Sequence, residues 1–269
     1  MARIFITGSS DGIGLLTAKR LVADGHRVVL HARNAKRAQE TEAACPGAEA
    51  VLTGDLGSIA ETKALAAQAQ ALLETEPGAR YDAVIHNAGV YRGQDNAVSR
   101  DTGFPRLFVV NTLAPYILAV SMAAPLPRRL IFISSSMHYG GRPKLETMPR
   151  SVTYSDSKVH MVMLAKAFAR RWASGLDVSV SADPGWVPTK LGGWSAPDSI
   201  DDSVATYTAL ALGQGEAKGN GGTNGGGVSG KYFVNSRAEK PQPVTNDEAL
   251  QDELIAKLAS LSGVPMVDI

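Results

Sequence analysis

Cysteine is almost absent from this chain, which has one, Cys45, among 269 residues. A single cysteine excludes a disulfide framework within the chain, and a reducing compartment such as the cytosol is its natural setting. Cys45 precedes Pro46-Gly47 and has no obvious histidine partner. We therefore interpret it as a structural or incidental residue.

Excess charge and long apolar runs are lacking as well. The formal net charge is +1, which gives no indication of nucleic acid or an acidic membrane surface as a partner. No apolar run approaches the ~20 residues that span a bilayer, and residues 4–6 are too short for the core of a signal peptide. No histidine, cysteine or aspartate cluster has metal-ligand spacing. We predict a cytoplasmic protein without a membrane span or a metal.

Apolar strand-like segments alternate with helix-like segments along the whole chain. The expected strands are residues 3–7, 27–31, 48–52, 81–86, 129–133, 176–181 and 231–234. The expected helices are residues 13–22, 34–44, 58–74, 106–122, 154–168 and 246–261. Continuous apolar strands separated by helices are typical of a parallel sheet that is covered on both faces. We predict an α/β fold, a Rossmann-type doubly wound seven-stranded parallel sheet flanked by helices.

No composition break divides the chain, so we expect a single nucleotide-binding domain over residues 1–269. Residues 213–230 are rich in glycine and are expected to form a flexible surface loop.

A glycine-rich turn lies between the first expected strand and the first expected helix. It reads Thr7-Gly8-Ser9-Ser10-Asp11-Gly12-Ile13-Gly14. In a doubly wound sheet this is where a dinucleotide pyrophosphate meets a helix N-terminus. The glycines permit positive φ and let phosphates approach the backbone. We therefore predict a dinucleotide site, although the spacing departs from the standard G-x-G-x-x-G and a tight turn without a ligand is the alternative.

The end of the second strand indicates which dinucleotide binds. An NAD site usually has an acidic residue here, about 20 residues past the glycines, to bind the ribose 2′-hydroxyl. This chain has Ala32, followed by Arg33 and Asn34. A guanidinium suits a 2′-phosphate, so we predict NADP(H) in preference to NAD(H). Alternatively, Arg33 is a surface residue at the start of the next helix, and Asp11 in the glycine turn weakens the case.

Tyr154 and Lys158 stand four residues apart at the start of an apolar helical run. On a helix this spacing places both side chains on the same face, one turn apart. A phenol alone titrates near pKa ~10, and a nearby ammonium is expected to lower that value into the range for proton transfer. The alternative is an ordinary exposed pair on an amphipathic helix.

Further motifs follow the expected strands in a fixed order. They are Asp55-Leu56, Asn87-Ala88-Gly89, Asn111, Ser134-Ser135-Ser136, and Pro184-Gly185 with Thr189. Together with the turn at 7–14 and Tyr154-x-x-x-Lys158, they resemble a classical short-chain dehydrogenase/reductase over nearly the whole chain. Residues 184–189 look most like the retinol-dehydrogenase-like and ketoreductase-like branches.

The resemblance implies roles for these residues. Asn111, Ser135, Tyr154 and Lys158 would be catalytic, with Asn111 holding a water in a proton relay and Ser135 and Tyr154 polarising and protonating the carbonyl. Asp55 and Leu56 would bind the adenine, Asn87 to Gly89 the ribose side, and residues 184–189 the nicotinamide. The predicted cofactor-binding residues are Gly8, Ser10, Asp11, Gly12, Ile13, Gly14, Arg33, Asn34, Asp55, Leu56, Asn87, Ala88, Gly89, Tyr154, Lys158, Pro184, Gly185, Val187 and Thr189.

Several of these roles have structural alternatives. Asp55 or Thr189 could act as a helix cap, and Asn111 could tie two helices together. The gap from Ser135 to Tyr154 exceeds the family's commonest spacing, so Ser134 and Ser136 remain alternatives to Ser135, although backbone hydrogen bonds suit them better.

The predicted function is NADP(H)-dependent hydride transfer between nicotinamide and a small-molecule carbonyl or alcohol. Met137, His138, Trp186 and Trp194 could wall an apolar pocket for an aromatic or apolar ketone or aldehyde, with residues 186–200 as the substrate loop. Equally, the tryptophans could anchor that loop, and His138 suits a pocket rim or the surface. A non-catalytic NADP-sensing protein is the alternative function, which the presence of both Tyr154 and Lys158 disfavours. Family members commonly form dimers or tetramers through the helices that carry Asn111 and Tyr154.

Overall fold

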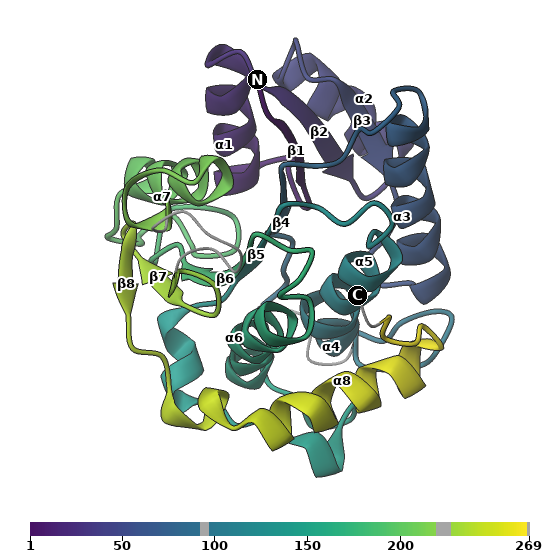
Figure 1. The fold of residues 1–269 in the computed structure, drawn as a ribbon, viewed down its shortest axis with the longest axis vertical. Coiled ribbons are helices and arrows are strands. Elements are labelled where there is room, and N and C mark those ends of the chain that lie inside the picture. The colour runs from purple at the N-terminus through teal and green to yellow at the C-terminus, as the bar shows by residue number, and fades with distance from the viewer. Residues whose placement is uncertain (92–96, 219–226, 268–269) are drawn as a thin grey trace.

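One twisted sheet of eight strands runs through the computed structural model, which describes residues 1–91, 97–218 and 227–267 (Figure 1). The strand order is β3-β2-β1-β4-β5-β6-β7-β8, with β1 to β7 parallel and β8 antiparallel to β7. The strands are β1 (Arg3–Ile6), β2 (Arg27–Ala32), β3 (Ala50–Thr53), β4 (Ala83–His86), β5 (Arg129–Ile133), β6 (Val178–Asp183), β7 (Tyr232–Val234) and β8 (Arg237–Glu239). The order reverses between β1 and β4, where doubly wound sheets bind their ligands.

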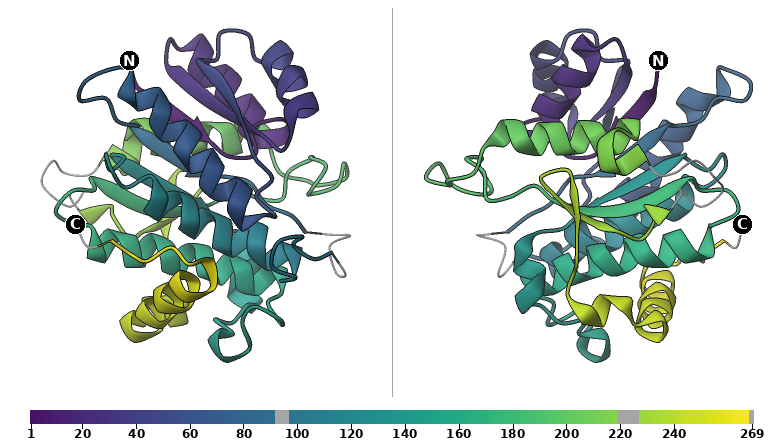
Figure 2. Two further views of the ribbon diagram at one scale, coloured as in Figure 1. Left: turned by 90° about the vertical axis from the view of Figure 1, so that its right-hand side faces the viewer. Right: turned by 60° about the vertical axis from the view of Figure 1, so that its left-hand side comes forward.

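Helices cover both faces of this sheet (Figure 2). They are α1 (Gly12–Ala23), α2 (Ala35–Ala44), α3 (Ile59–Glu74), α4 (Arg106–Phe108), α5 (Ala114–Ser121), α6 (Tyr154–Arg171), α7 (Ile200–Leu212) and α8 (Glu248–Ser262). Helices α1 and α7 pack on one face, and α3, α5 and α6 pack on the other. The doubly wound α/β fold predicted from the sequence is therefore confirmed.

A separate hydrophobic core lies on each face of the sheet, and the apolar residues of the strands contribute to both. Ile4 and Ile6 of β1 belong to the cluster beneath α1 and α7, whereas Phe5 belongs to the cluster beneath α3, α5 and α6. All three side chains are fully buried. Side chains alternate across a strand, so the consecutive apolar residues of β1 supply both cores.

The strand count of seven was wrong, because a short eighth strand completes a hairpin. Strands β7 and β8 are joined by Asn235 and Ser236, whose φ angles are 48° and 63°. Two residues with positive φ form the tight turn that suits a hairpin, and asparagine tolerates this region.

Helix α7 was not among the expected helices, although its boundaries are marked in the sequence. Ser199 caps its N-terminus by accepting a hydrogen bond from the Asp202 N–H, and Gly213 ends it with a φ of 63°. The helix lies between the expected substrate loop and the glycine-rich segment. Residues 219–226 of that glycine-rich segment lie outside the described residues.

The single helix expected over residues 106–122 is divided by a π-helical segment, Val109–Leu113. Such segments occur frequently at functional sites, and Asn111 lies at the centre of this one. The helix α5 that follows is buried from Ala114 to Val120.

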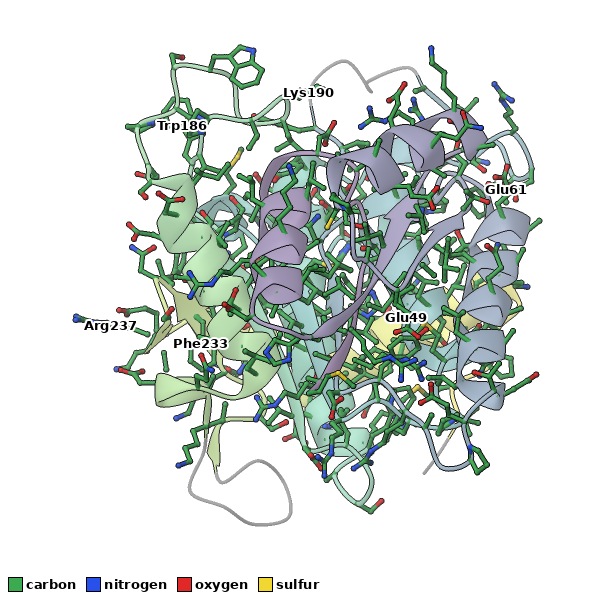
Figure 3. The ribbon with its side chains drawn as sticks, turned by 90° about the horizontal axis from the view of Figure 1, so that it is seen from above. Glu49, Glu61, Trp186, Lys190, Phe233 and Arg237 are labelled. Atoms are coloured by element: carbon green, nitrogen blue, oxygen red, sulfur yellow. The ribbon has the colours of Figure 1, made fainter. Side chains whose placement is uncertain are left out.

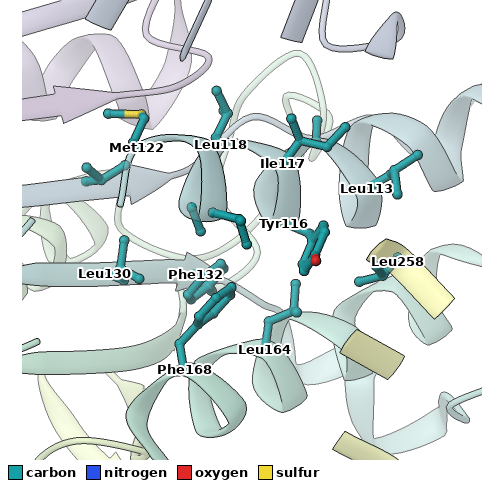
Figure 4. Close-up of a cluster of buried hydrophobic side chains, with 14 of the residues drawn as sticks. Leu113, Tyr116, Ile117, Leu118, Met122, Leu130, Phe132, Leu164, Phe168 and Leu258 are labelled. Atoms are coloured by element: carbon teal, nitrogen blue, oxygen red, sulfur yellow. The ribbon is translucent and has the colours of Figure 1, made fainter. Parts of the chain in front are cut away.

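Helix α8 lies across α6 and closes the second core from outside. Leu258 of α8 packs beside Tyr116 of α5 and Leu164 of α6 (Figure 4). Two hydrogen bonds fasten the segment after α8, from Tyr116 Oη to the Val264 oxygen at 2.9 Å and from Trp172 Nε1 to the Val267 oxygen at 2.7 Å. Helix α8 and the segment after it therefore cover part of α6 and the end of Tyr116 within the chain.

Among the described residues, no helix is both long and apolar enough to cross a membrane. Cys45 is a buried free thiol at the end of α2.

Candidate active site

Tyr154 begins helix α6, and a capping box fixes its position. The preceding residue, Thr153, accepts a hydrogen bond from the Asp156 N–H at 3.2 Å, and the Asp156 carboxylate accepts one from the Thr153 N–H at 2.9 Å. This reciprocal pair satisfies N–H groups that a helix start otherwise leaves without a partner. The phenol is thereby carried on a well-anchored first turn.

Lys158 lies one turn further along α6, as the sequence predicted, and its ammonium is 5.2 Å from the centre of the Tyr154 ring. The side chain is 5% exposed. Its Nζ donates a hydrogen bond to the Ile133 carbonyl at 2.9 Å. Burial lowers the pKa of Lys158 to about 8, because a low-dielectric surrounding disfavours the charged form.

The phenol pKa departs from the sequence-based expectation. Burial raises the pKa of Tyr154, the charges of Asp183 and Tyr91 add to that rise, and the hydrogen bond with Ser135 opposes it. Desolvation of the phenolate therefore outweighs the nearby ammonium in this chain. The prediction that the pKa of Tyr154 would be lowered was therefore wrong for the protein alone. The phenol is protonated and can donate its proton.

Three consecutive serines follow β5, and their hydroxyls have different surroundings. Ser134 donates to the Lys158 carbonyl at 2.8 Å, so it ties β5 to α6. The Ser135 hydroxyl accepts a hydrogen bond from the Met137 N–H at 3.2 Å and hydrogen-bonds the Tyr154 phenol. Ser136 lines a cavity at the end of β6. The geometry therefore favours Ser135 as the partner of Tyr154.

Asn111 is buried close to Lys158, and its side-chain amide is fully engaged. Its Oδ1 accepts from the Val90 N–H at 2.8 Å, while its Nδ2 donates to the Val90 carbonyl at 2.9 Å and to Ser157 at 3.2 Å. A Cβ at Gly89 would lie 3.6 Å from Asn111 Oδ1 and 3.7 Å from Lys158 Nζ. Asn111 thus ties its own helical segment to α6 and to the loop after β4, as the structural alternative expected.

The glycine turn is packed against the loop after β4. Gly8 has a φ of 64°, and a Cβ there would lie 2.8 Å from the Ala88 Cα. Asn87 Nδ2 donates to the carbonyls of Thr7 and Gly8 at 2.9 and 3.1 Å, and a Cβ on Gly14 would lie 2.6 Å from the same nitrogen. Glycine is required at both positions, so Asn87 shapes the turn.

The start of α1 keeps its N–H groups available. Asp11 stands at the N-cap, and its side chain makes no cap hydrogen bond within the described parts of the chain, whereas α2, α3, α6, α7 and α8 are capped by a side chain. The first N–H groups of a helix have no intrahelical partner and attract phosphate. This end of α1, including Gly12, Ile13 and Gly14, therefore fits the pyrophosphate of a dinucleotide.

His31, which no sequence motif indicated as a site residue, fixes the glycine turn. Its Nδ1 accepts from the Gly8 N–H at 2.9 Å and its Nε2 contacts the Gly54 oxygen at 2.8 Å. A neutral ring with the proton on Nε2 satisfies both contacts. Burial lowers the pKa of His31, which favours this neutral form.

The expected adenosine-binding residues surround the ends of β2 and β3. Arg33 is exposed, and Asn34 caps α2 by accepting from the Arg37 N–H at 3.0 Å. Asp55 accepts from the Gly57 N–H at 2.9 Å and pairs with Arg106 at 2.7 Å, so its carboxylate serves an ion pair rather than a helix cap. Leu56 is 5% exposed and belongs to the core.

The loop after β6 lies against the glycine turn. Lys190 pairs with Asp11 at 2.9 Å, and Asp11 also pairs with Arg37 at 3.1 Å. A Cβ on Gly12 would contact Thr189 at 3.5 Å. Figure 3 labels Trp186 and Lys190 on this loop, which extends past α7 at the edge of the molecule. The nicotinamide residues expected at 184–189 thus lie beside the expected phosphate site, with Val187 buried.

The predicted substrate residues do not form one apolar wall. Trp194 is 78% exposed and Met137 is 40% exposed. Trp186 lines the cavity that Ser136 borders, and its Nε1 anchors the loop through the Gly192 carbonyl at 2.7 Å. Trp186 therefore both lines a cavity and anchors its loop, whereas Trp194 does not line this cavity.

The expectation that His138 lies at a pocket rim or the surface was wrong, because its side chain is fully buried. Its Nδ1 contacts the Ser135 carbonyl at 2.7 Å, and its Nε2 accepts from the Gln242 N–H at 3.1 Å. The ring lies between Tyr139 and Tyr232, with centroids 4.1 and 4.8 Å away. His138 fastens the serine loop to the chain segment before α8.

Asp183 and Tyr91 belong to the site and were also missed. Asp183 ends β6 and is 4% exposed. The Tyr91 ring lies 4.3 Å from the Tyr154 ring. Asp183 immediately precedes the Pro184-Gly185 motif, and Tyr91 closely follows Asn87-Ala88-Gly89, so proximity to these motifs was the available signal.

The chain resembles known proteins over its length. A family model described as short chain dehydrogenase matches residues 2–198. An uncharacterized oxidoreductase of Emericella nidulans is 46% identical over 98% of each chain, and the short-chain dehydrogenase chyC of Penicillium rubens is 39% identical over 99% of each. A protein of Burkholderia multivorans described as a short-chain dehydrogenase/reductase, solved with bound NADP, has a TM-score of 0.64 and 26% identity, covering 90% of this chain and 99% of that one.

Proposed function

Because the chain belongs to the short-chain dehydrogenase family, we propose that it is an NADP(H)-dependent carbonyl reductase acting on aromatic or apolar ketones and aldehydes. The observation that carries the proposal is the convergence of the Tyr154 phenol, the Ser135 hydroxyl and the Lys158 ammonium at one end of the sheet. These groups can polarise and protonate a carbonyl oxygen. A non-catalytic sensor has no observation in its favour.

The cofactor would be held by residues on both sides of the point between β1 and β4 where the strand order reverses. The open end of α1 would bind the pyrophosphate, Asp55 the adenine, and Arg33 the 2′-phosphate. Residues 87–89 and 184–189 would flank the nicotinamide riboside. The Burkholderia relative with bound NADP supports a nicotinamide cofactor, and Arg33 supports the phosphorylated form.

Bound NADPH would supply the hydride. Ser135 would donate a hydrogen bond to the substrate oxygen, and Tyr154 would give that oxygen its proton as negative charge develops. Lys158 would stabilise the phenolate that remains, since an opposite charge favours the ionised form. The raised pKa of Tyr154, caused first by burial and then by the Asp183 charge, keeps the phenol protonated until negative charge develops on the substrate oxygen.

Steady-state consumption of NADPH in the presence of a panel of ketones and aldehydes tests this function. We expect turnover of at least one aromatic carbonyl. A protein that binds NADPH but reduces no member of a broad panel would contradict the proposal. We propose that this enzyme is a single-domain cytosolic protein. A homodimer or homotetramer is also proposed, and α8 limits how much of α6 such an assembly can use.

Cofactor preference is predicted to depend on Arg33. Replacing it by alanine should raise the KM for NADPH about tenfold or more, because a charge-assisted contact with the 2′-phosphate is lost. NADH lacks that phosphate, so its KM should change much less. Arg20→Ala is the matched control, since Arg20 is an exposed arginine on α1 that pairs with Asp24 at 2.8 Å. Equal effects on both cofactors would show that Arg33 does not recognise the phosphate.

The catalytic serine is predicted to be Ser135. Ser135→Ala should lower kcat about 100-fold or more, as expected when a donor to a developing oxyanion is removed. Ser136→Ala should cost less than about tenfold, because its hydroxyl borders the cavity and is not joined to the phenol. Steady-state measurement of kcat for both variants decides between them, and the opposite ranking would move the role to Ser136.

A further inference from the structure

Asp183 is a buried carboxylate whose hydrogen-bond donors are neutral. It accepts hydrogen bonds from the Gly185 N–H at 2.8 Å and from the Tyr232 hydroxyl at 3.3 Å. Within residues 1–91, 97–218 and 227–267, no lysine, arginine or histidine forms a salt bridge with it. Burying an unpaired charge is costly, and proteins tolerate such costs mainly at functional sites.

The charge of Asp183 acts on the catalytic groups. It raises the pKa of Tyr154 in addition to the larger effect of burial, and it opposes the fall that burial imposes on the pKa of Lys158. Asp183 also borders the same cavity as Ser136, the neighbour of Ser135. The cavity that Asp183 borders therefore lies next to the loop that carries Ser135.

The cavity next to Asp183 has a volume of about 210 Å³, enough for a small substituent. Two further carboxylates line it, Asp198 and Asp202, and no lysine, arginine or histidine of the described chain is among its lining residues. Asp198 accepts from the Trp186 N–H at 2.6 Å, whereas Asp202 is exposed. Trp186 supplies apolar surface, together with Pro184 and Val234. The cavity thus combines an apolar wall with a negative one.

We propose that Asp183 is a specificity-determining residue that selects carbonyl substrates bearing an ammonium group near an apolar or aromatic body. The ammonium would enter the cavity and pair with Asp183, while the carbonyl lies at Ser135 and Tyr154. A neutral hydroxyl could occupy the same place but would not bring a charge opposite to that of Asp183. The inference rests on the carbonyl reduction proposed above and names its substrate class.

Three para-substituted benzaldehydes test the charge preference directly. They carry a dimethylaminomethyl group, which is protonated at neutral pH, an isobutyl group of the same shape, and a carboxylate. We expect kcat/KM to be about 10–100-fold higher for the cationic aldehyde than for its isobutyl counterpart, as is typical of hydrogen bonds to charged groups. The carboxylate should be the poorest substrate, because like charges repel.

Variants identify the residue responsible. In Asp183→Asn, whose amide oxygen can still accept from the Gly185 N–H, the ratio of kcat/KM between the cationic and isobutyl aldehydes should fall to near one. Asp201→Asn is the matched control with the same change of charge, since Asp201 is exposed and does not line the cavity. It should retain the wild-type ratio.

The outcomes separate this inference from the proposed function. If wild-type enzyme reduces the isobutyl compound as well as the cationic one, or if Asp183→Asn keeps the preference, the inference is wrong and carbonyl reduction stands. If none of the aldehydes and no member of the wider panel is reduced, the proposed function itself fails. If Asp183→Asn does not fold, the kcat/KM values of the wild-type enzyme for the three aldehydes still show whether it prefers the cationic substrate.

Discussion

Tyr154→Phe is expected to lower kcat about 10²–10⁴-fold, the usual effect of removing a positioned general acid. The ring remains, so its contact with Tyr91 at 4.3 Å and its place on the first turn of α6 are retained. Only the hydroxyl that gives a proton to the substrate is lost. NADPH binding, measured by cofactor fluorescence, should change little.

Tyr116→Phe is the matched control, because it removes a buried tyrosine hydroxyl that belongs to α5 rather than to the site. That hydroxyl donates to the Val264 carbonyl, so the control should lose about 1 kcal/mol of stability and keep its turnover. Substantial turnover in Tyr154→Phe would rule out the phenol as the proton donor.

Lys158→Met is expected to stabilise the folded protein while lowering kcat/KM at least about 100-fold. Burial lowers the pKa of Lys158 from 10.5 to about 8, and each unit corresponds to about 1.4 kcal/mol. Charging the buried ammonium therefore costs about 3 kcal/mol of stability at pH 7. Loss of the hydrogen bond to the Ile133 carbonyl offsets about 1–2 kcal/mol, which leaves a net gain of about 1–2 kcal/mol.

The stability that Lys158→Met gains over wild type is expected to decrease as the pH rises. At pH 7 the lysine is protonated in both the folded and the unfolded protein, so the full penalty is present. As pH rises through about 8, folded Lys158 loses its proton while the unfolded chain keeps its own up to 10.5. The unfolded state then binds more protons, and wild-type stability rises. The stability difference between Lys158→Met and wild type should therefore shrink between pH 7 and pH 10.

Denaturant unfolding at both pH values measures this difference. Lys166→Met is the control on the same helix, since Lys166 is only partly buried and donates to the Gly230 carbonyl at 3.0 Å. It should keep its activity. A Lys158→Met variant that is less stable than wild type at pH 7 would show that the ammonium is favourable in the fold.

Much of the fold could be predicted because local signals and burial agree. Strand β1 is apolar at its three last positions and is buried throughout, as a parallel strand must be. The β7–β8 hairpin was missed because Asn235-Ser236 is a weaker turn signal than Asn-Gly. The break in the helix at Val109–Leu113 could not be predicted, since a π-helical segment depends on tertiary contacts such as those of Asn111 with Val90.

Motif spacing predicted which residues meet in the candidate site, but not their electrostatics. Tyr154 and Lys158 are one turn apart because helix periodicity requires it. The pKa of the phenol depends instead on burial and on Asp183, which β6 brings to the site from a different part of the chain. No local pattern around Tyr154 indicates that contribution, because it arises only when β5 and β6 pair.

The cover that α8 provides changes how the fold responds to dilution. When two subunits bury an apolar face against each other, the stability of each depends on protein concentration by mass action. Here Leu254, Ile255 and Leu258 bury that surface from within the same polypeptide. The contacts between α8 and α6 are therefore intramolecular, and their own contribution to stability does not depend on protein concentration.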